Sequence, residues 1–213
     1  MTAINSGHYV LFDGTNKPFT TYCDFESDPG FAWTLIESLS LAKAKTSKYR
    51  RNFSYNTESD GCGVDWSEYR LSKTRMASVK NSAGSNYFRA TCNFNAELDK
   101  GLLDHRDYLR VAFCRYNSLF STSSSYTCAT VDYFNVRGYS CRQCTIPIYF
   151  GNQNYHMYVD VSRATQSCSR LKIPDTVNNE EAFGRYQNSN SKFRCSNSST
   201  STTNWWIGGT LIE

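Results

Sequence analysis

Nine cysteines spread over the whole chain constrain its fold more than any other feature. They lie mostly in strand-like segments, and one pair alone has Cys-x-x-Cys spacing. This spread is typical of a disulfide framework made in an oxidising compartment, and a zinc site would need a second closely spaced pair. We therefore expect a secreted, disulfide-stabilised protein. Eight cysteines alone permit roughly a hundred pairings, so the connectivity stays open. The cysteines are Cys23, Cys62, Cys92, Cys114, Cys128, Cys141, Cys144, Cys168 and Cys195.

The closely spaced pair, Cys141 and Cys144, has two interpretations. Two thiols at this spacing can close a small redox-active disulfide. They can also belong to two separate structural bridges, which is the interpretation we favour. The odd total leaves one thiol over, and an unpaired thiol can crosslink two subunits.

Size and composition indicate one extracellular domain, residues 1–213. The net charge of +4 is too small to favour nucleic acid as a partner. No apolar run approaches the roughly 20 residues that cross a bilayer, and the first five residues lack the apolar segment of a signal peptide. We expect no membrane insertion. Two glycosylation sequons, at Asn52 and Asn197, fit secretion.

Strand patterns dominate the chain. Alternating or aromatic-rich runs predict most of the strands, and polar Gly151–Asn154 predicts a hairpin loop between two of them. Asp65 to Glu68 has the form of a helix capping box, which predicts a helix that continues to Val79. We expect an α+β fold, mostly antiparallel sheet with one or two helices. The predicted strands cover residues 8–12, 19–25, 87–94, 108–116, 130–136, 146–150 and 155–161.

The first forty residues carry a specific resemblance. Ser6-Gly7, Tyr22-Cys23-Asp24, Gly30 and Trp33-Thr34-Leu35 resemble the opening of a fibrinogen-like domain, of the type found in invertebrate fibrinogen-related proteins. The resemblance implies an extracellular recognition fold. It also implies that Cys23 pairs with a cysteine shortly before Ser6, where this chain has only five residues, so that partner is either cut away or replaced.

The later hallmarks of that family have no counterpart here. An Asp/Asn-rich calcium loop and an Asn-Leu-Asn-Gly run are both missing. We therefore do not transfer the calcium site, and we expect a shorter or rebuilt C-terminal half. Asp99, Asp104 and Asp107 form a weak alternative cluster for calcium, but we expect a solvated loop there and no metal ligands.

No catalytic constellation can be assembled from spacing. The chain has three histidines, no Gly-x-Ser-x-Gly and no His-x-x-x-His. We expect no enzyme activity, no catalytic residues and no cofactor.

Aromatic rings interleaved with amides are the best candidates for ligand binding. A sugar needs a ring to stack on and planar polar groups that hydrogen-bond its hydroxyls. The hairpin supplies both, and the Trp pair near the C-terminus offers a second platform. The alternative is that these rings simply cover a core. The candidate residues are Tyr149, Asn152, Asn154, Tyr155, His156, Tyr158, Trp205 and Trp206.

The basic run from Lys43 to Arg51 adds a possible anion site. Its point charges and two guanidinium groups suit the sulfate or carboxylate groups of heparin-like or sialylated glycans. Such runs are also often solvated loops.

Together these features favour a secreted, lectin-like recognition or adhesion module that binds carbohydrate or a glycoprotein non-covalently. The alternative is a structural protein of the extracellular matrix or body surface that lacks a sugar pocket. The leftover thiol makes a homo-oligomer possible in either case.

Overall fold

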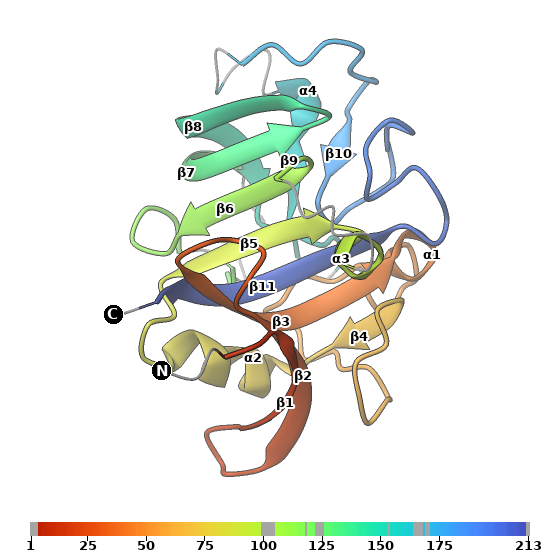
Figure 1. Cartoon of the computed structure of the whole chain (residues 1–213). Helices are drawn as coiled ribbons and strands as arrows, with labels where there is room; N and C mark the ends of the chain where they lie inside the picture. Colours follow the sequence, from red (N-terminus) through yellow and green to blue (C-terminus); the bar gives the residue numbers. More distant parts are fainter. Residues whose placement is uncertain are drawn as a thin grey trace.

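The computed structural model describes residues 4–98, 105–117, 119–121, 126–152, 154–163, 168 and 171–211. Within them the chain forms a mostly antiparallel sheet with four short helices (Figure 1). The fold is therefore α+β and mainly antiparallel, as expected, with more helices than the one or two predicted. The strands are β1 Gly7–Phe12, β2 Pro18–Asp24, β3 Phe31–Ser40, β4 Glu68–Arg70, β5 Tyr87–Cys92, β6 Tyr108–Ala112, β7 Tyr126–Val136, β8 Tyr139–Tyr149, β9 Tyr158–Asp160, β10 Glu181–Ala182 and β11 Thr202–Thr210, and the helices are α1 Leu41–Ala44, α2 Lys73–Asn81, α3 Phe94–Leu98 and α4 Val161–Arg163.

One sheet joins all the strands. Its order is β1-β2-β3-β11-β5-β6-β7-β8-β9-β10, and β4 pairs with β3 beside this path. In Figure 1 the blue strand β11 lies between orange β3 and yellow β5. The last strand of the sequence thus lies in the interior of the sheet, and the first strand is at its edge.

The N-terminal strands form as the local pattern predicts. β1 pairs with β2 over its full length, from Gly7 opposite Cys23 to Phe12 opposite Pro18. β2 then pairs with the start of β3. The predicted antiparallel pairing of β8 with β9 is confirmed, because Ile148 lies opposite Val159 and Tyr149 opposite Tyr158. The loop is longer than the predicted residues 151–154, because β8 ends at Tyr149 and β9 begins only at Tyr158.

The core is aromatic and surrounds β11. Trp205 contacts Phe53 and Phe88, whereas Trp206 contacts Tyr22 and Phe94. Consecutive strand residues point to opposite faces, so the two indoles fill the core on both sides of the sheet. Large side chains from distant parts of the chain are therefore held together by this one strand.

The predicted helix over 65–79 is wrong at its start. The Asp65 carboxylate accepts hydrogen bonds from the Ser67 N–H and hydroxyl, which closes a turn, and Glu68 then begins β4. The helix begins only at Lys73, and its N-cap is Ser72, whose hydroxyl accepts from the Arg75 N–H. A short acidic capping pattern serves a turn equally well, because the same side chain caps both structures.

Three disulfides join six of the cysteines: Cys92–Cys195, Cys128–Cys168 and Cys141–Cys144. Cys141 and Cys144 bond to each other, so our expectation of two separate bridges is wrong. Cys23 is unpaired and buried, and Cys62 and Cys114 are unpaired and exposed. No helix in the described part of the chain has the length and apolar character needed to cross a bilayer.

Candidate functional site

An open cleft of about 470 Å³ brings together two regions that the sequence singled out separately. Two of its residues, Lys45 and Arg50, belong to the basic run, which begins at the end of α1, and two others, Asn154 and Tyr155, belong to the β8–β9 loop. Its third side comes from the segment after β10. We call it the basic cleft; its lining residues are Ala44, Lys45, Arg50, Asn154, Tyr155, Arg185, Tyr186 and Gln187.

Buried Asn52 joins the basic run to the hairpin loop. Its backbone N–H donates to the Asn152 carbonyl at 3.2 Å, and its side-chain amide donates to the carbonyls of Ser121 and Phe150. Each of these bonds crosses between segments far apart in the sequence. Because a buried amide that loses its partners is costly, this residue fixes the two walls of the cleft relative to each other.

The hairpin loop is compact and leaves Asn154 and Tyr155 at the surface. The Asn152 carboxamide oxygen accepts from the N–H groups of Asn154 and Tyr155 at 2.7 and 3.1 Å. Gly151 has φ = 79°, and a Cβ there would lie 2.4 Å from the Tyr155 carbonyl oxygen. Only glycine fits that position, so the loop presents the Asn154 amide and the Tyr155 ring in a defined geometry.

Arg185 forms one wall of the cleft and supports the Tyr155 ring. Its guanidinium lies 4.0 Å from the ring centroid and 3.0 Å from the Glu181 carboxylate, and it donates to the Gln187 side-chain oxygen. Burial raises the pKa of Glu181 even though Arg185 opposes the shift. The cation–π contact holds the Tyr155 ring in place at the cleft surface, where the ring is 37% exposed.

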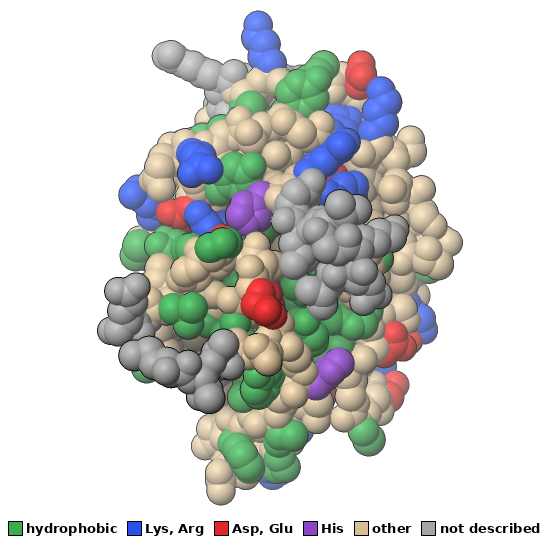
Figure 2. Space-filling model, in the orientation of Figure 1, with side chains coloured by type: hydrophobic (Ala, Val, Ile, Leu, Met, Phe, Trp, Pro, Cys, Tyr) green, Lys and Arg blue, Asp and Glu red, His purple; other side chains and the backbone are tan. Residues whose placement is uncertain are grey.

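Charge in the cleft is positive. Lys45 and Arg50 are exposed, and neither has an acidic partner among the described residues. In the part of the chain that the structure describes, no acidic side chain lines the cleft. Separately from the cleft, Figure 2 shows that on one face of the molecule Lys and Arg side chains gather mainly over the half that carries β6 to β10. An anionic ligand therefore suits the cleft better than a cationic one.

Beneath the cleft lies a buried ionic cluster centred on Glu37 of β3. The Glu37 carboxylate lies 2.8 Å from Arg70 Nη1 and 3.0 Å from His156 Nε2. Arg70 also donates to the carbonyls of Arg51 and Asn52 at 2.9 and 2.7 Å. Burial raises the pKa of Glu37, but the nearby charges of His156 and Arg70 outweigh it and hold that pKa below its usual value. The cluster ties both cleft walls to the central sheet.

The eight predicted ligand residues do not all lie at the cleft. Asn154 and Tyr155 line the cleft, and Tyr155 is 37% exposed. Asn152 shapes the loop. Tyr149 packs on Tyr158, whose hydroxyl accepts from Arg185 at 3.4 Å.

The prediction that His156, Trp205 and Trp206 bind ligand is wrong, because all three side chains are buried. His156 is 2% exposed and belongs to the Glu37 cluster, while the indoles are 1% and 0% exposed. A ring buried on both faces cannot stack on a ligand. The Trp pair therefore packs the core, which is the alternative that the sequence left open.

Sequence reasoning missed Arg185 and Gln187. They follow β10, a two-residue strand that pairs with β9. Isolated polar residues after so short a strand give no periodic signal. Only the long-range β9–β10 pairing brings them beside the hairpin loop.

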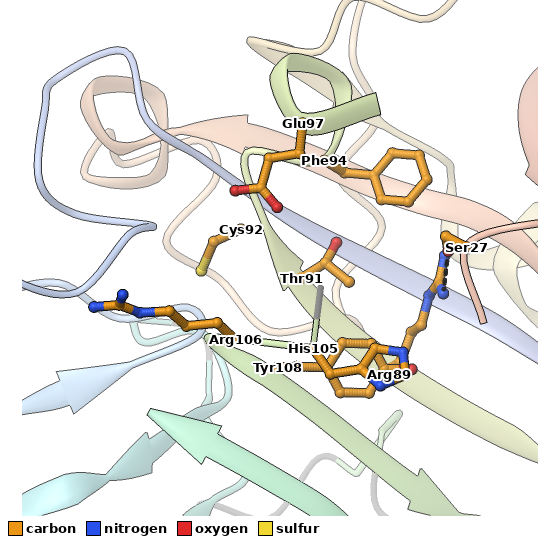
Figure 3. Close-up of a pocket in the computed structure, with 9 residues that line it drawn as sticks. All are labelled: Ser27, Arg89, Thr91, Cys92, Phe94, Glu97, His105, Arg106 and Tyr108. Carbon is orange, nitrogen blue, oxygen red and sulfur yellow. Dashed lines mark hydrogen bonds between the residues drawn. The ribbon is translucent and has the colours of Figure 1, made fainter. Parts of the chain in front are cut away.

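A second hollow, drawn in Figure 3, holds about 20 Å³. Arg89 reaches into it from β5 and donates to the Ser27 hydroxyl at 3.0 Å, and the rings of His105 and Tyr108 lie beside it. This volume suits about one water molecule. It is too small for a sugar.

Metal binding finds no support in the described residues. They contain no group of three His, Cys, Asp or Glu side chains that could hold an ion. Of the weak calcium cluster, Asp99 and Asp104 lie outside the described residues. Asp107 is buried and accepts from the backbone N–H groups of Arg137 and Arg194.

The two glycosylation sequons differ in access. Asn52 is 0% exposed and its amide is fully engaged, so a glycan there is incompatible with this fold. Asn197 is exposed. Asn197 is thus the accessible acceptor of the two.

Comparison of the chain with protein-family models, curated proteins and solved structures found no match.

Proposed function

We propose that this chain is a secreted, lectin-like recognition module that binds acidic carbohydrate, free or on a glycoprotein, through the basic cleft. The observation that carries the proposal is the convergence of the Tyr155 ring, the Asn154 and Gln187 amides and three cations in one open cleft. An aromatic ring stacks on the apolar C–H face of a sugar, and amides form hydrogen bonds with its hydroxyls. Guanidinium groups form charge-assisted hydrogen bonds with the sulfate or carboxylate groups of an acidic sugar.

Two features support the resemblance to a fibrinogen-like domain and the extracellular part of the proposal. Most of the residues that carry the resemblance lie in β1, β2 and the start of β3, which are consecutive antiparallel strands as the motif implies; Ser6 precedes β1 and Gly30 precedes β3. Three disulfides are compatible with an oxidising compartment.

Removing one cation from the cleft should weaken binding of an acidic glycan. We expect Arg50→Ala and Arg185→Ala each to raise the Kd about tenfold or more, because a hydrogen bond to a charged group contributes about 1.5–3 kcal/mol. Affinity should also fall as salt rises, since the cleft is open to solvent. The measurement is titration of purified protein with the best ligand from an array of neutral, sialylated and sulfated glycans, with and without calcium.

Arg115→Ala is the matched control, because Arg115 is exposed and does not line the cleft. It removes the same charge and should leave the Kd unchanged. An equal effect of all three variants would show that only net charge matters and would refute the cleft as the site. Absence of binding to every glycan would refute the lectin proposal.

A second candidate function is a structural protein joined by intermolecular disulfides. It is favoured by two unpaired, exposed thiols, Cys62 and Cys114. In that case non-reducing electrophoresis should show a covalent dimer or ladder that disappears with reductant and is absent from the Cys62→Ser/Cys114→Ser variant. A monomer under non-reducing conditions would contradict this function and leave the lectin proposal untouched.

A further inference from the structure

The Cys141–Cys144 bridge lies inside a regular strand. β7 and β8 keep one register on both sides of it, with Cys144 opposite Val131 and Cys141 opposite Phe134. In a regular strand, residues three apart point to opposite faces and their Cα atoms lie about 10 Å apart. Here the Cα atoms of Cys141 and Cys144 are 6.0 Å apart. The strand is therefore contracted locally where the two sulfurs meet.

Gln143 absorbs this contraction. Its φ is 49°, in the left-handed region that non-glycine residues seldom occupy. Such backbone conformations persist only where the surroundings impose them. The flanking register does not require it, because the pairs on either side of Gln143 continue without a shift. The disulfide is the constraint that holds Gln143 there, and opening the bridge lets the residue return to an extended conformation.

The bridge is also accessible. Arg142 and Gln143 are exposed, and both cysteines are half-buried. The Arg142 charge, adjacent to Cys141 in sequence, favours a thiolate once the bridge opens. By contrast, Cys92 and Cys195 are 3% and 0% exposed. Access and backbone constraint therefore coincide at Cys141–Cys144.

We propose that Cys141–Cys144 is a thiol–disulfide exchange site that accepts two electrons from a dithiol, apart from any stabilising role. One thiolate of the dithiol attacks a bridge sulfur, forms a mixed disulfide and releases the other cysteine as a thiolate. The second thiol of the dithiol then attacks the mixed disulfide. The products are two protein thiols, at Cys141 and Cys144, and the dithiol in its disulfide form. This site is separate from the basic cleft and does not depend on the lectin function.

The three native bridges provide the test. Exposed free thiols are first blocked with N-ethylmaleimide, and the folded protein is then treated with dithiothreitol for graded times. Acid quenching, alkylation and peptide mass spectrometry follow each bridge. We expect Cys141–Cys144 to open at least about tenfold faster than Cys92–Cys195 and Cys128–Cys168. Cys128 is also exposed. If Cys128–Cys168 opened as fast as Cys141–Cys144 or faster, exposure alone would determine the rate of opening, and the proposal would be overturned.

Two substitutions at Gln143 isolate the backbone constraint. Glycine accepts a left-handed φ without a steric penalty, so Gln143→Gly should slow the opening of the bridge. Valine is β-branched and resists that conformation, so Gln143→Val should speed it. Circular dichroism confirms that both exposed-site variants are folded. Identical opening rates in the wild type and both variants would contradict the proposed role of Gln143 and with it the assignment of this bridge as a tuned exchange site.

Discussion

Trp206→Ala is expected to lower the free energy of unfolding by about 3–5 kcal/mol. The indole is 0% exposed, its ring lies 4.6 Å from that of Phe94, and the Arg89 guanidinium lies 4.6 Å from it. Its Nε1 donates to the Thr91 hydroxyl at 3.0 Å. Alanine removes these contacts and leaves a cavity in the core beside β11, an interior strand of the sheet. Chemical denaturation followed by circular dichroism measures the loss.

Tyr155→Ala is the matched control for the loss of a large ring. Tyr155 lies at the cleft surface, so its removal should affect stability far less than removal of Trp206 and should weaken sugar binding instead. Trp206→Phe keeps a ring and should lose less stability than Trp206→Ala. A loss below about 1 kcal/mol for Trp206→Ala would contradict the buried, interior position of β11.

The strands that the sequence predicts are those with a local signal. β1, β2 and the β8–β9 hairpin have alternating side chains or turn residues at their ends, and such patterns follow from the two-residue period of a strand. β11 escaped prediction because residues 202–210 show no alternation. An interior strand that is buried on both faces does not need alternating apolar and polar residues. Its pairing with β3 and β5 is also long-range.

The sequence predicts two parts of the candidate site separately, but it does not predict that they lie side by side. The basic run and the hairpin loop each have a recognisable composition, but their meeting depends on the buried amide of Asn52 and on the Glu37 cluster. Neither a lone Asn nor a lone Glu in a strand indicates such a role. The disulfide pairing could not be predicted from the sequence for a similar reason, because it depends on distances in the folded chain.

The Glu37 cluster leads to the second large effect. Glu37→Gln should cost about 3–5 kcal/mol of stability, because it leaves the Arg70 guanidinium buried without its counter-charge. Asp60→Asn removes a carboxylate from an exposed pair with Lys48 and should change stability little. Because Arg70 holds the carbonyls of Arg51 and Asn52, Glu37→Gln should also weaken glycan binding, although Glu37 does not line the cleft.

The pH dependence distinguishes this cluster from ordinary packing. The pKa of Glu37 is lowered in the folded state, so the contribution of its charge is fully present above the unfolded value of about 4.3 and is lost as the pH falls through the folded pKa. Denaturation curves from pH 7 to pH 3 should therefore converge, with the wild type losing more stability below pH ~4 than Glu37→Gln. Parallel curves would mean that Glu37 is not ionised in the native protein, and the account of how both cleft walls are held would fail with it.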